Sequence, residues 1–506
     1  MEIPYGFTEK IKINQHAKPV LTTQLDTHRA ALLILPEAAA AAAWKQLPYA
    51  EVLKPRFQRL QQRDRQASRL VTDLPNGSAT HVILQALNPQ CSTFELLTTA
   101  RKLAEELCKQ DTPSVLLQFA GFRATDVRRI TGAMTAALLA AICPMPSYKS
   151  EADKPAALKR IEICGLKEVL DLAQVRAEIT GNHLARWLSA LPANELTPGA
   201  YRKFVAALAR KEGWQMSFLD HKVLARKRAG AFLAVAQASP VPDAGIVHLR
   251  YRPRASAGKP GLALVGKGIC FDTGGVNVKP AKYMNGMHED MQGSAVALGT
   301  LLALSRLRFN HPVDCWLALA QNHVGSRAYK PNDVVRACNG TSIEVIHTDA
   351  EGRMVLADTL VLASREKPRL MIDYATLTGA CIHALSSRYS GVFSNRDALH
   401  GPLTAAGRDS GERVWPFPSD RDFDEALKSD IADIKQCTLE GEADHILATR
   451  FLNRFVADGI DWIHVDLAAS NHKGGLGHIP TETTGFGVRL TLNLLLQQQI
   501  LERAWS

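Results

Sequence analysis

Leu262-Ala-Leu-Val-Gly-Lys-Gly-Ile-Cys-Phe-Asp-Thr-Gly-Gly275 is the stretch that decides the fold. Its first four residues, Leu262 to Val265, form a short apolar run of the kind found in strands that are covered on both faces. Two glycines that permit positive φ follow Asp272 and Thr273. We therefore expect Lys267 at or just beyond a strand end and Asp272 in the adjoining turn, where open α/β sheets carry their chemistry.

A second acidic cluster repeats this arrangement about sixty residues after Asp290. The apolar run Ile343-Glu-Val-Ile-His347 ends in Thr348-Asp-Ala-Glu-Gly-Arg353. Asp349 and Glu351 are two residues apart, and in an extended segment this spacing directs both side chains to the same side. Two carboxylates aimed at one point repel each other unless cations lie between them.

The two clusters together predict a metal site. Hard, oxygen-rich ligand sets hold Mg²⁺ or Mn²⁺, and carboxylates also bind Zn²⁺. Two such ions, about 3.5 to 4 Å apart, activate a bridging water and polarise a carbonyl. Lys279 could share the stabilisation of the resulting oxyanion. Metals beside Lys267 would lower its pKa enough for a neutral amine to coordinate. If the clusters converge, the protein is a metallohydrolase.

These residues have two other interpretations. Aspartate and glycine are common turn formers, so either cluster alone is compatible with an ordinary turn. A glycine-rich phosphate loop is the functional alternative, but neither Gly-x-x-x-x-Gly-Lys-Ser/Thr nor Gly-x-Gly-x-x-Gly occurs in the chain. No nucleophilic serine or cysteine lies beside a candidate base in either cluster, which favours metal-activated water.

The length of 506 residues, with 46% apolar residues, favours two or three domains. Short apolar runs alternate with helical patterns over residues 1–160, which predicts a small α/β domain. We expect this domain, which contains neither acidic cluster, to have an oligomeric or regulatory role. Apolar spacing over 161–191 predicts a long connecting helix that ends before Pro192. Residues 192–506 are then a larger α/β catalytic domain, with a central mixed sheet covered by helices. Thr197 before Pro198 is the expected N-cap of its first helix.

Targeting and redox features predict a cytoplasmic protein without a membrane partner. Met1 to Val20 contains no apolar signal-peptide core, and no run reaches eighteen uninterrupted apolar residues. The nine cysteines are scattered singly, without a Cys-x-x-Cys pair. We therefore expect reduced thiols, and a metal held by oxygen and nitrogen.

The formal charge of +10 is concentrated between Lys54 and Arg69, where six basic residues face one acid, Asp64. Arg56, Arg59 and Arg63 recur at helical spacing and share one predicted face. Such a face attracts nucleic acid or another polyanion. A solvated helix surface is the alternative interpretation.

At the two acidic clusters the chain resembles the leucyl (cytosol) aminopeptidase family, metallopeptidase family M17. The family signature Asn-Thr-Asp-Ala-Glu-Gly-Arg appears here as His347-Thr-Asp-Ala-Glu-Gly-Arg353. The upstream block matches in residue type and spacing, from Val265 to Gly275 and on to Asp290. Similarity continues through Asn194-Glu-Leu-Thr-Pro198, Asp373 to Ala380 and Thr484 to Arg489, which covers essentially the whole second domain.

The resemblance implies a role for each matching residue. Two zinc or manganese ions, for which Mg²⁺ or Co²⁺ could substitute, would bind five side chains, with Asp272 and Glu351 bridging them: Lys267, Asp272, Asp290, Asp349 and Glu351. Lys279 falls on the lysine that stabilises the tetrahedral gem-diolate, and Arg353 on the arginine that holds a bicarbonate general base. Five residues fall near the bicarbonate or the bound substrate: Met284, His347, Thr376, Leu377 and Gly379.

The implied function is a metal-dependent aminopeptidase that hydrolyses the N-terminal bond of unblocked peptides, assembled as a homohexamer. The alternative is a catalytically weak relative that acts as a peptide- or DNA-binding or regulatory protein. Three departures from the family pattern bear on the pocket. His347 replaces the usual Asn, Gln292 replaces a Gly, and Glu442-Ala-Asp-His-Ile446 replaces Gly-Gly-Ala-Ile. Asp444 and His445 are therefore expected near the substrate pocket, where a charge changes which residue is accepted.

Overall fold

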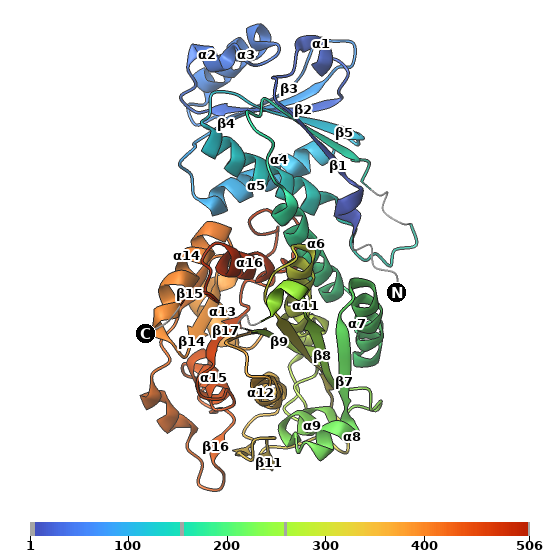
Figure 1. Cartoon of the computed structure of the whole chain (residues 1–506), viewed down its shortest axis with the longest axis vertical. Coiled ribbons are helices and arrows are strands. Elements are labelled where there is room, and N and C mark those ends of the chain that lie inside the picture. Colours follow the sequence, from blue (N-terminus) through green and yellow to red (C-terminus); the bar gives the residue numbers. More distant parts are fainter. Residues whose placement is uncertain (1–5, 152–155, 258–260, 504–506) are drawn as a thin grey trace. The chain divides into compact units, whose positions relative to one another are not determined.

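The computed structural model describes residues 6–151, 156–257 and 261–503. Its chain divides into two compact units, shown with their elements in Figure 1. Among the described residues, the N-terminal unit contains those up to 179 together with 475–480, and the C-terminal unit contains those from 180 to 474 and from 481 to 503. The predicted domain limits of 1–160, 161–191 and 192–506 stay a prediction.

The N-terminal unit is a six-stranded sheet in the order β1-β6-β5-β2-β4-β3. All its strand pairs are parallel except β3 with β4. The elements in chain order are β1 (Lys12–His16), α1 (Thr22–Leu25), β2 (Ala30–Pro36), α2 (Ala41–Trp44), α3 (Ala50–Arg63), β3 (Arg69–Asp73), β4 (His81–Leu87), α4 (Thr93–Cys108), β5 (Ser114–Phe119), α5 (Ala124–Ile142), β6 (Arg160–Cys164) and α6 (Ala173–Ser189), the last of which crosses the boundary between the units.

Both faces of this sheet are buried, because β2 is apolar throughout and successive side chains point to opposite faces. Leu32 and Ile34 pack in one core with the apolar side chains of α4 and α5. Leu33 and Leu35 pack in a second core with Trp44 and other residues of the segment from α2 to α3.

The C-terminal unit is built on an eight-stranded mixed sheet in the order β15-β14-β17-β13-β9-β10-β8-β7, with a separate three-stranded sheet, β11-β12-β16. The elements in chain order are α7 (Pro198–Glu212), β7 (Gln215–Asp220), α8 (His221–Arg226), α9 (Gly230–Ala236), β8 (Gly245–Tyr251), β9 (Leu262–Asp272), α10 (Ala281–Met284), α11 (Gln292–Arg306), β10 (Val313–Asn322), β11 (Val334–Arg336), β12 (Ser342–Glu344), α12 (Glu351–Ser364), β13 (Leu370–Ala375), α13 (Gly379–Leu385), β14 (Ser390–Ser394), α14 (His400–Ser410), β15 (Val414–Pro416), β16 (Ile434–Lys435), α15 (Asp444–Asn453), β17 (Asp461–Asp466) and α16 (Val488–Leu496).

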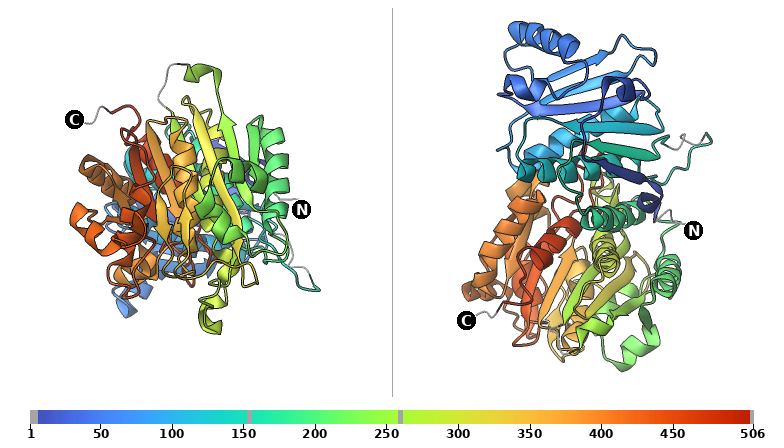
Figure 2. Two further views of the ribbon diagram at one scale, coloured as in Figure 1. Left: turned by 90° about the horizontal axis from the view of Figure 1, so that it is seen from below. Right: turned by 45° about the horizontal axis from the view of Figure 1, so that its top comes forward.

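The four central strands, β17, β13, β9 and β10, are parallel, and antiparallel strands flank them. Helix α11 packs on one side of these strands, and α12 with α9 on the other (Figure 1). Val265 and Ile269 of β9 share a buried core with Met354 and Leu360 of α12. Figure 2 shows the twisted strands of this sheet from two further directions. The predicted α/β fold with a mixed sheet covered by helices is confirmed.

Several predicted elements are confirmed, and three predictions were wrong. The alternating strands and helices predicted over residues 1–160 and the helix capped by Thr197 form as expected. Strand β9 does not end before the glycines but continues to Asp272, so Lys267 lies in mid-strand. Glu351 begins a helix and is not in an extended segment. The predicted long helix begins only at Ala173. None of the helices among the described residues has the length and hydrophobicity needed to cross a lipid bilayer.

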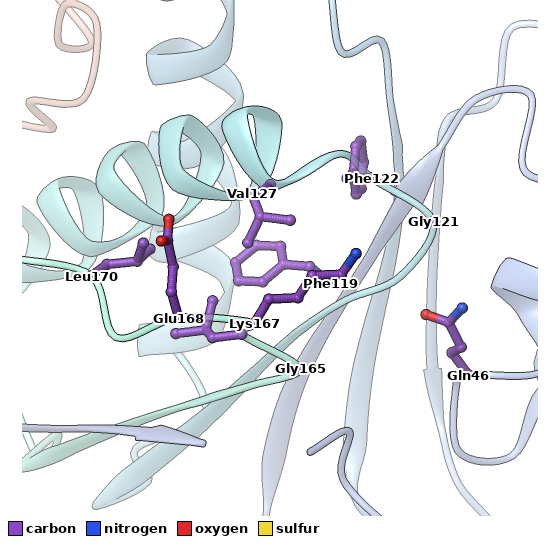
Figure 3. Close-up of a pocket in the computed structure, with 11 residues that line it drawn as sticks. Gln46, Phe119, Gly121, Phe122, Val127, Gly165, Lys167, Glu168 and Leu170 are labelled. Carbon is purple, nitrogen blue, oxygen red and sulfur yellow. The ribbon is translucent and has the colours of Figure 1, made fainter. Parts of the chain in front are cut away.

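A small pocket lies within the N-terminal unit (Figure 3). Phe119, Phe122 and Val127 give it an apolar wall, and Lys167 and Glu168 are its charged residues. Its lining contains neither a nucleophile with a base nor a set of metal ligands. The chemistry predicted from the sequence is located in the other unit.

Candidate metal centre

The candidate centre is formed by the carboxyl end of β9 and the starts of two helices. Asp272 is the last residue of β9, and Asp290 lies two residues before α11. Glu351 is the first residue of α12, which packs on the sheet. Segments that are about eighty residues apart in the sequence therefore meet at one edge of the sheet, as expected for an open α/β fold.

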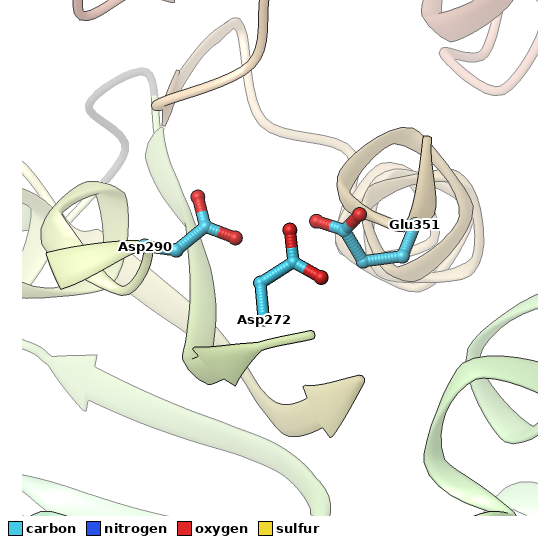
Figure 4. Close-up of side chains that lie close together, drawn as sticks. All are labelled: Asp272, Asp290 and Glu351. Atoms are coloured by element: carbon cyan, nitrogen blue, oxygen red, sulfur yellow. The ribbon is translucent and has the colours of Figure 1, made fainter. Parts of the chain in front are cut away.

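Three carboxylates converge at this edge. One oxygen from each of Asp272, Asp290 and Glu351 lies within 4.8 Å of the other two. Figure 4 shows their side chains pointing toward a common space. All three residues are buried, at 2%, 6% and 1% exposure. Such close burial of like charges is unfavourable unless cations compensate for it.

Two lysines interleave with the carboxylates. The Nζ atom of Lys267 lies 2.8 Å from Asp290 Oδ1 and 2.9 Å from Glu351 Oε1, and it donates to the carbonyl of Thr376. The Nζ atom of Lys279 lies 2.9 Å from Asp272 Oδ2.

Lys279 also connects the fourth predicted carboxylate to the group. Its Nζ atom lies 2.6 Å from Asp349 Oδ1, and the Asp349 side chain is 28% exposed, more than any of the other three. All seven metal and catalytic positions implied by the resemblance lie in the C-terminal unit.

The electrostatics of the centre favour additional positive charge. Burial disfavours the charged form of Lys267, but the adjacent carboxylates of Asp290 and Glu351 outweigh it, so its pKa is raised. Burial, reinforced by the charge of Asp272, raises the pKa of Glu351 well above its ordinary value. Burial likewise raises the pKa of Asp290. When all four carboxylates are ionised, the two ammonium groups leave two negative charges for bound cations to balance.

The residues present fit divalent cations. Asp290 Oδ2 and Glu351 Oε2 are buried and accept no hydrogen bond from any described residue. Buried carboxylate oxygens without partners are costly, and hard divalent ions bind such oxygens directly. A bound cation would also favour the neutral form of Lys267. Only the neutral amine has a lone pair with which to act as a ligand.

Asn322 holds Asp272 in position. A register shift between Ala320 and Asn322 places Asn322 opposite Asp272 across the β9–β10 pair. Its Nδ2 atom donates to Asp272 Oδ1 at 2.8 Å and to the carbonyl of Thr348 at 3.0 Å. Irregularities of this kind re-aim side chains near active sites.

Gly352 is required by the close approach of α12 to β9. A Cβ atom at this position would lie 2.6 Å from Lys267 Cε and 2.7 Å from its Nζ. These distances are shorter than any ordinary contact. The glycine between Glu351 and Arg353 therefore has a steric reason, because a larger residue would take the space of the Lys267 side chain.

Arg353 is buried and binds an acid of the same unit. Its Nη2 donates to both oxygens of Asp444, at 2.8 and 3.0 Å, and its Nη1 donates to the carbonyl of Gln436 at 3.2 Å. Burial disfavours the guanidinium charge, but the carboxylate of Asp444 outweighs it and raises the pKa of Arg353. The expected position of Asp444 near the substrate pocket becomes a specific contact with a predicted catalytic residue.

The remaining predicted residues lie around this centre in different ways. The Thr376 hydroxyl donates to Asp290 Oδ1 at 2.7 Å, and the backbone N–H of Leu377 donates to Asp466. The backbone N–H of His347 donates to Gln436 Oε1. Gly379 is exposed at the start of α13, and Met284 is half-buried at the end of α10.

The part of the chain that forms this centre is similar to a known protein family. The model of the cytosol aminopeptidase family, catalytic domain, matches residues 183–492. The chain belongs to the cytosol aminopeptidase family. The matched range contains every residue of the candidate centre.

Individual relatives agree with the family match. A probable cytosol aminopeptidase of Syntrophotalea carbinolica is 41% identical over 353 residues, which are 68% of this chain and 70% of that protein. One of Parasynechococcus marenigrum is 36% identical over 433 residues, which are 84% of this chain and 88% of that protein.

Two solved structures have the same fold. A mutant of tomato leucine aminopeptidase is 26% identical with a TM-score of 0.84, covering 96% of this chain and 97% of that one. A bottromycin maturation enzyme, BotP, in complex with Mn is 28% identical with a TM-score of 0.79, covering 94% of this chain and 100% of that one. Membership of the cytosol aminopeptidase family supports a metal-dependent aminopeptidase.

Sequence reasoning missed two residues of the centre. Asn322 follows the apolar stretch Cys315 to Ala320, and polar residues at the carboxyl ends of such strands are candidate site residues, so a signal was present. Gln436 gave no comparable signal. It is fully buried, and its side chain accepts from the N–H groups of Ile346 and His347 and donates to the carbonyl of Ala350.

The basic segment lies in the N-terminal unit. Arg56 donates to Thr72 and to the carbonyl of Asp73, so it is engaged with β3. Arg59 and Arg63, on the predicted basic face of α3, are exposed. Binding of nucleic acid by this face stays a prediction.

Proposed function

We propose that this protein is a dinuclear metal aminopeptidase that releases the N-terminal residue of unblocked peptides. The observation that carries the proposal is the convergence of Asp272, Asp290 and Glu351 around a buried space, with Lys267 and Lys279 between them and Asp349. Two divalent ions, zinc or manganese, with Mg²⁺ or Co²⁺ as substitutes, would bind there. When bound, they supply an activated water and polarise the scissile carbonyl.

The chain's own residues have separate tasks in this proposal. Five are metal ligands: Lys267, Asp272, Asp290, Asp349 and Glu351. Lys279 is the cation that stabilises the oxyanion of the gem-diolate. Its side chain is partly buried, with 14% exposed. Thr376 fixes Asp290 through its hydroxyl and Lys267 through its carbonyl. Met284, His347, Leu377 and Gly379 are proposed to border the bound peptide.

The proposed metal ions account for the preference for unblocked peptides. A free α-amine in its neutral form has a lone pair that a divalent ion at the centre would bind. An acetylated N-terminus has an amide nitrogen, whose lone pair is delocalised into the carbonyl and does not serve as a ligand. Release of single residues from the N-terminus follows from this requirement.

The resemblance also implies a bicarbonate at Arg353, and this stays a prediction. Nη2 of Arg353 donates to the carboxylate of Asp444 and Nη1 to the carbonyl of Gln436, whereas its buried Nε donates to no described residue. A small anion could accept from this Nε, but the carboxylate of Asp444 would oppose its charge. We derive no step through bicarbonate.

The decisive experiment measures hydrolysis of a panel of amino-acid p-nitroanilides, with their N-acetylated forms as the blocked control. The enzyme is stripped with a chelator and reloaded separately with Zn²⁺, Mn²⁺ or Co²⁺. We expect activity on the free forms only, its loss on stripping, and its return on reloading. Glu351→Gln should lower kcat by at least a hundredfold, whereas Glu37→Gln, at an exposed position in the N-terminal unit, should leave it unchanged.

Two results would overturn the proposal. Hydrolysis of the acetylated forms with none of the free forms would exclude an aminopeptidase. Peptide binding without any cleavage after metal loading would instead favour the alternative of a binding or regulatory protein.

A further inference from the structure

We propose that the segment Asp466 to Asn471 is a brace that fixes the metal ligand Asp290 from two sides. This inference rests on the proposed function and adds positioning residues to the centre. It begins from the turn that contains Asp290. Glu289, just before the ligand, and Gln292, two residues after it, bind the same asparagine, which lies 182 and 179 residues further along the chain.

Asn471 is the first arm of this brace. Its Oδ1 accepts from Gln292 Nε2 at 3.1 Å, and its Nδ2 donates to Glu289 Oε2. Gln292 is buried, at 1% exposure, and is the first residue of α11. One amide group therefore binds the turn on both sides of Asp290, and it limits how far this ligand can move.

Asp466 is the second arm. It is the last residue of β17 and is buried, at 1% exposure. Its Oδ1 accepts from the backbone N–H of Leu377 at 3.2 Å, and its Oδ2 accepts from the hydroxyl of Thr378 at 2.6 Å. The residue before these two, Thr376, donates its hydroxyl to Asp290 Oδ1 at 2.7 Å. Asp466 thus holds the loop whose first residue binds the metal ligand.

The residues between the two arms are themselves held by hydrogen bonds. The backbone N–H of Ala468 donates to the carbonyl of Asp466 at 2.8 Å. The hydroxyl of Thr484 donates to the carbonyls of Ala469 and Ser470, at 2.8 and 3.0 Å. Because this short segment is fixed, the two arms keep a constant position relative to each other.

The brace acts on one half of the centre. Lys267 Nζ contacts Asp290 in this half, at 2.8 Å, and Lys279 Nζ contacts Asp349 in the other half, at 2.6 Å. The carbonyl of Thr376, in the loop held by the second arm, also accepts from Lys267 at 2.8 Å. Residues that orient metal ligands set the affinity of the site. We therefore expect the brace to determine the affinity for the ion that Lys267 and Asp290 would bind, and to leave the ion at Asp349 unaffected.

The test measures metal binding, not turnover. Metal-free protein is titrated with Mn²⁺, and the free ion is measured by electron paramagnetic resonance. Asp349→Ala and Asp290→Ala each impair one half of the centre and leave the other. In the Asp349→Ala background, which keeps the braced half, Asn471→Ala should lower the affinity by about tenfold to a hundredfold. In the Asp290→Ala background the same change should have no effect.

Further variants, also in the Asp349→Ala background, test the second arm. Asp466→Ala should lower the affinity by a similar factor, whereas Asp466→Asn keeps an oxygen acceptor for the loop and should lose less than about tenfold. Gln292→Ala removes a single contact of the first arm and replaces Asn471→Ala if that variant does not fold. Asn453→Ala, at a half-buried position at the end of α15, is the control and should bind Mn²⁺ as its parent does. Circular dichroism compares the folding of all variants.

The outcomes separate this inference from the proposed function. If loss of the first arm weakens Mn²⁺ binding in both backgrounds, or in neither, the brace does not act through Asp290 and the inference is wrong. It is also wrong if Asp466→Ala binds Mn²⁺ as its parent does. A wild type that binds two ions without any aminopeptidase activity would overturn the proposed function, and the titrations would still decide whether the brace exists. A wild type that binds no divalent ion would overturn both.

Discussion

The buried carboxylate of Asp272 is held by residues that are not adjacent to it in the sequence. Asp272 accepts from the backbone N–H of Gly274 and from Asn322, both at 2.8 Å. The carbonyl of Thr348 accepts from Asn322 and Tyr329, and the backbone N–H of Thr348 donates to Asn277. These partners fix the direction in which the ligand oxygens point, which is what determines the affinity of a metal site.

The first prediction concerns Asn322. Its replacement by alanine removes the donor to Asp272 and leaves the carboxylate less firmly oriented. We expect the affinity for Mn²⁺ or Zn²⁺ to fall by about tenfold to a hundredfold. Competition with a chromophoric chelator measures this directly. Asn285→Ala, at an exposed position in the same unit, is the control and should bind metal as the wild type does.

Asp358 gives a prediction for pH. It is fully buried in α12 and accepts from the N–H groups of Phe232 and Cys338. Burial raises its pKa to about 6, from 3.8 for a free aspartate. Between these two values the folded state holds a proton that the unfolded state has released, so the free energy of unfolding falls as pH rises.

The expected size of this effect is about 3 kcal/mol between about pH 4 and pH 6, since each unit of pKa corresponds to about 1.4 kcal/mol. Denaturant unfolding at a series of pH values measures it as the difference between the wild type and Asp358→Asn. Above about pH 6 the difference should be constant. A difference that does not change with pH would contradict the assignment.

At the scale of elements, β9 shows where sequence patterns mislead. The apolar run Leu262 to Val265 predicts a short strand, because Gly266-Lys267-Gly268 is typical of a turn. The strand nevertheless continues for seven more residues, to Asp272. Glycines are found in this strand because α11 approaches it closely, and a Cβ at Gly266 would lie 2.4 Å from the Cα of Ser294. Packing, which one sequence does not display, overrides local propensity here.

The approach of α12 to β9 gives the third prediction. Gly352→Ala should displace Lys267 and reduce kcat by at least a hundredfold, because the new Cβ has no room. Gly132→Ala is a matched control, since this glycine also lies in a helix, α5, and its Cβ would meet nothing within 4 Å. The control should be neutral or more stable by about 0.5 to 1 kcal/mol. Equal activity of the two variants would show that Lys267 tolerates displacement.

At the scale of the whole molecule, the sequence predicts the fold class and the family well, but the supporting contacts poorly. The ligands lie in two short motifs, and their chemistry can be recognised without a structure. Asn322, Gln436 and Asp444 reach the centre from segments 50 to about 90 residues away from their partners. Such contacts depend on strand order and helix placement, and one chain without relatives carries no pairing signal for them.

The fourth prediction concerns assembly. The resemblance to cytosol aminopeptidases implies a homohexamer, which for a chain of 55.3 kDa has a mass of about 330 kDa. Sedimentation velocity over a range of concentrations should give this mass. A stable species of 55 kDa that retains full activity would contradict it, because assembly would then be unnecessary for catalysis.

The segment 475–480 has a consequence for inheritance. It belongs to the N-terminal unit although the residues before and after it belong to the other unit, and its Ile479 is buried in the N-terminal core. Over the described residues the chain therefore passes between the units three times. Recombination that replaced only the codons up to position 179 would change the core in which Ile479 packs. Ile479 itself would stay the same. We expect the two parts of such genes to be inherited together, and chimaeras of distant relatives to require this hexapeptide from the same parent as the N-terminal unit.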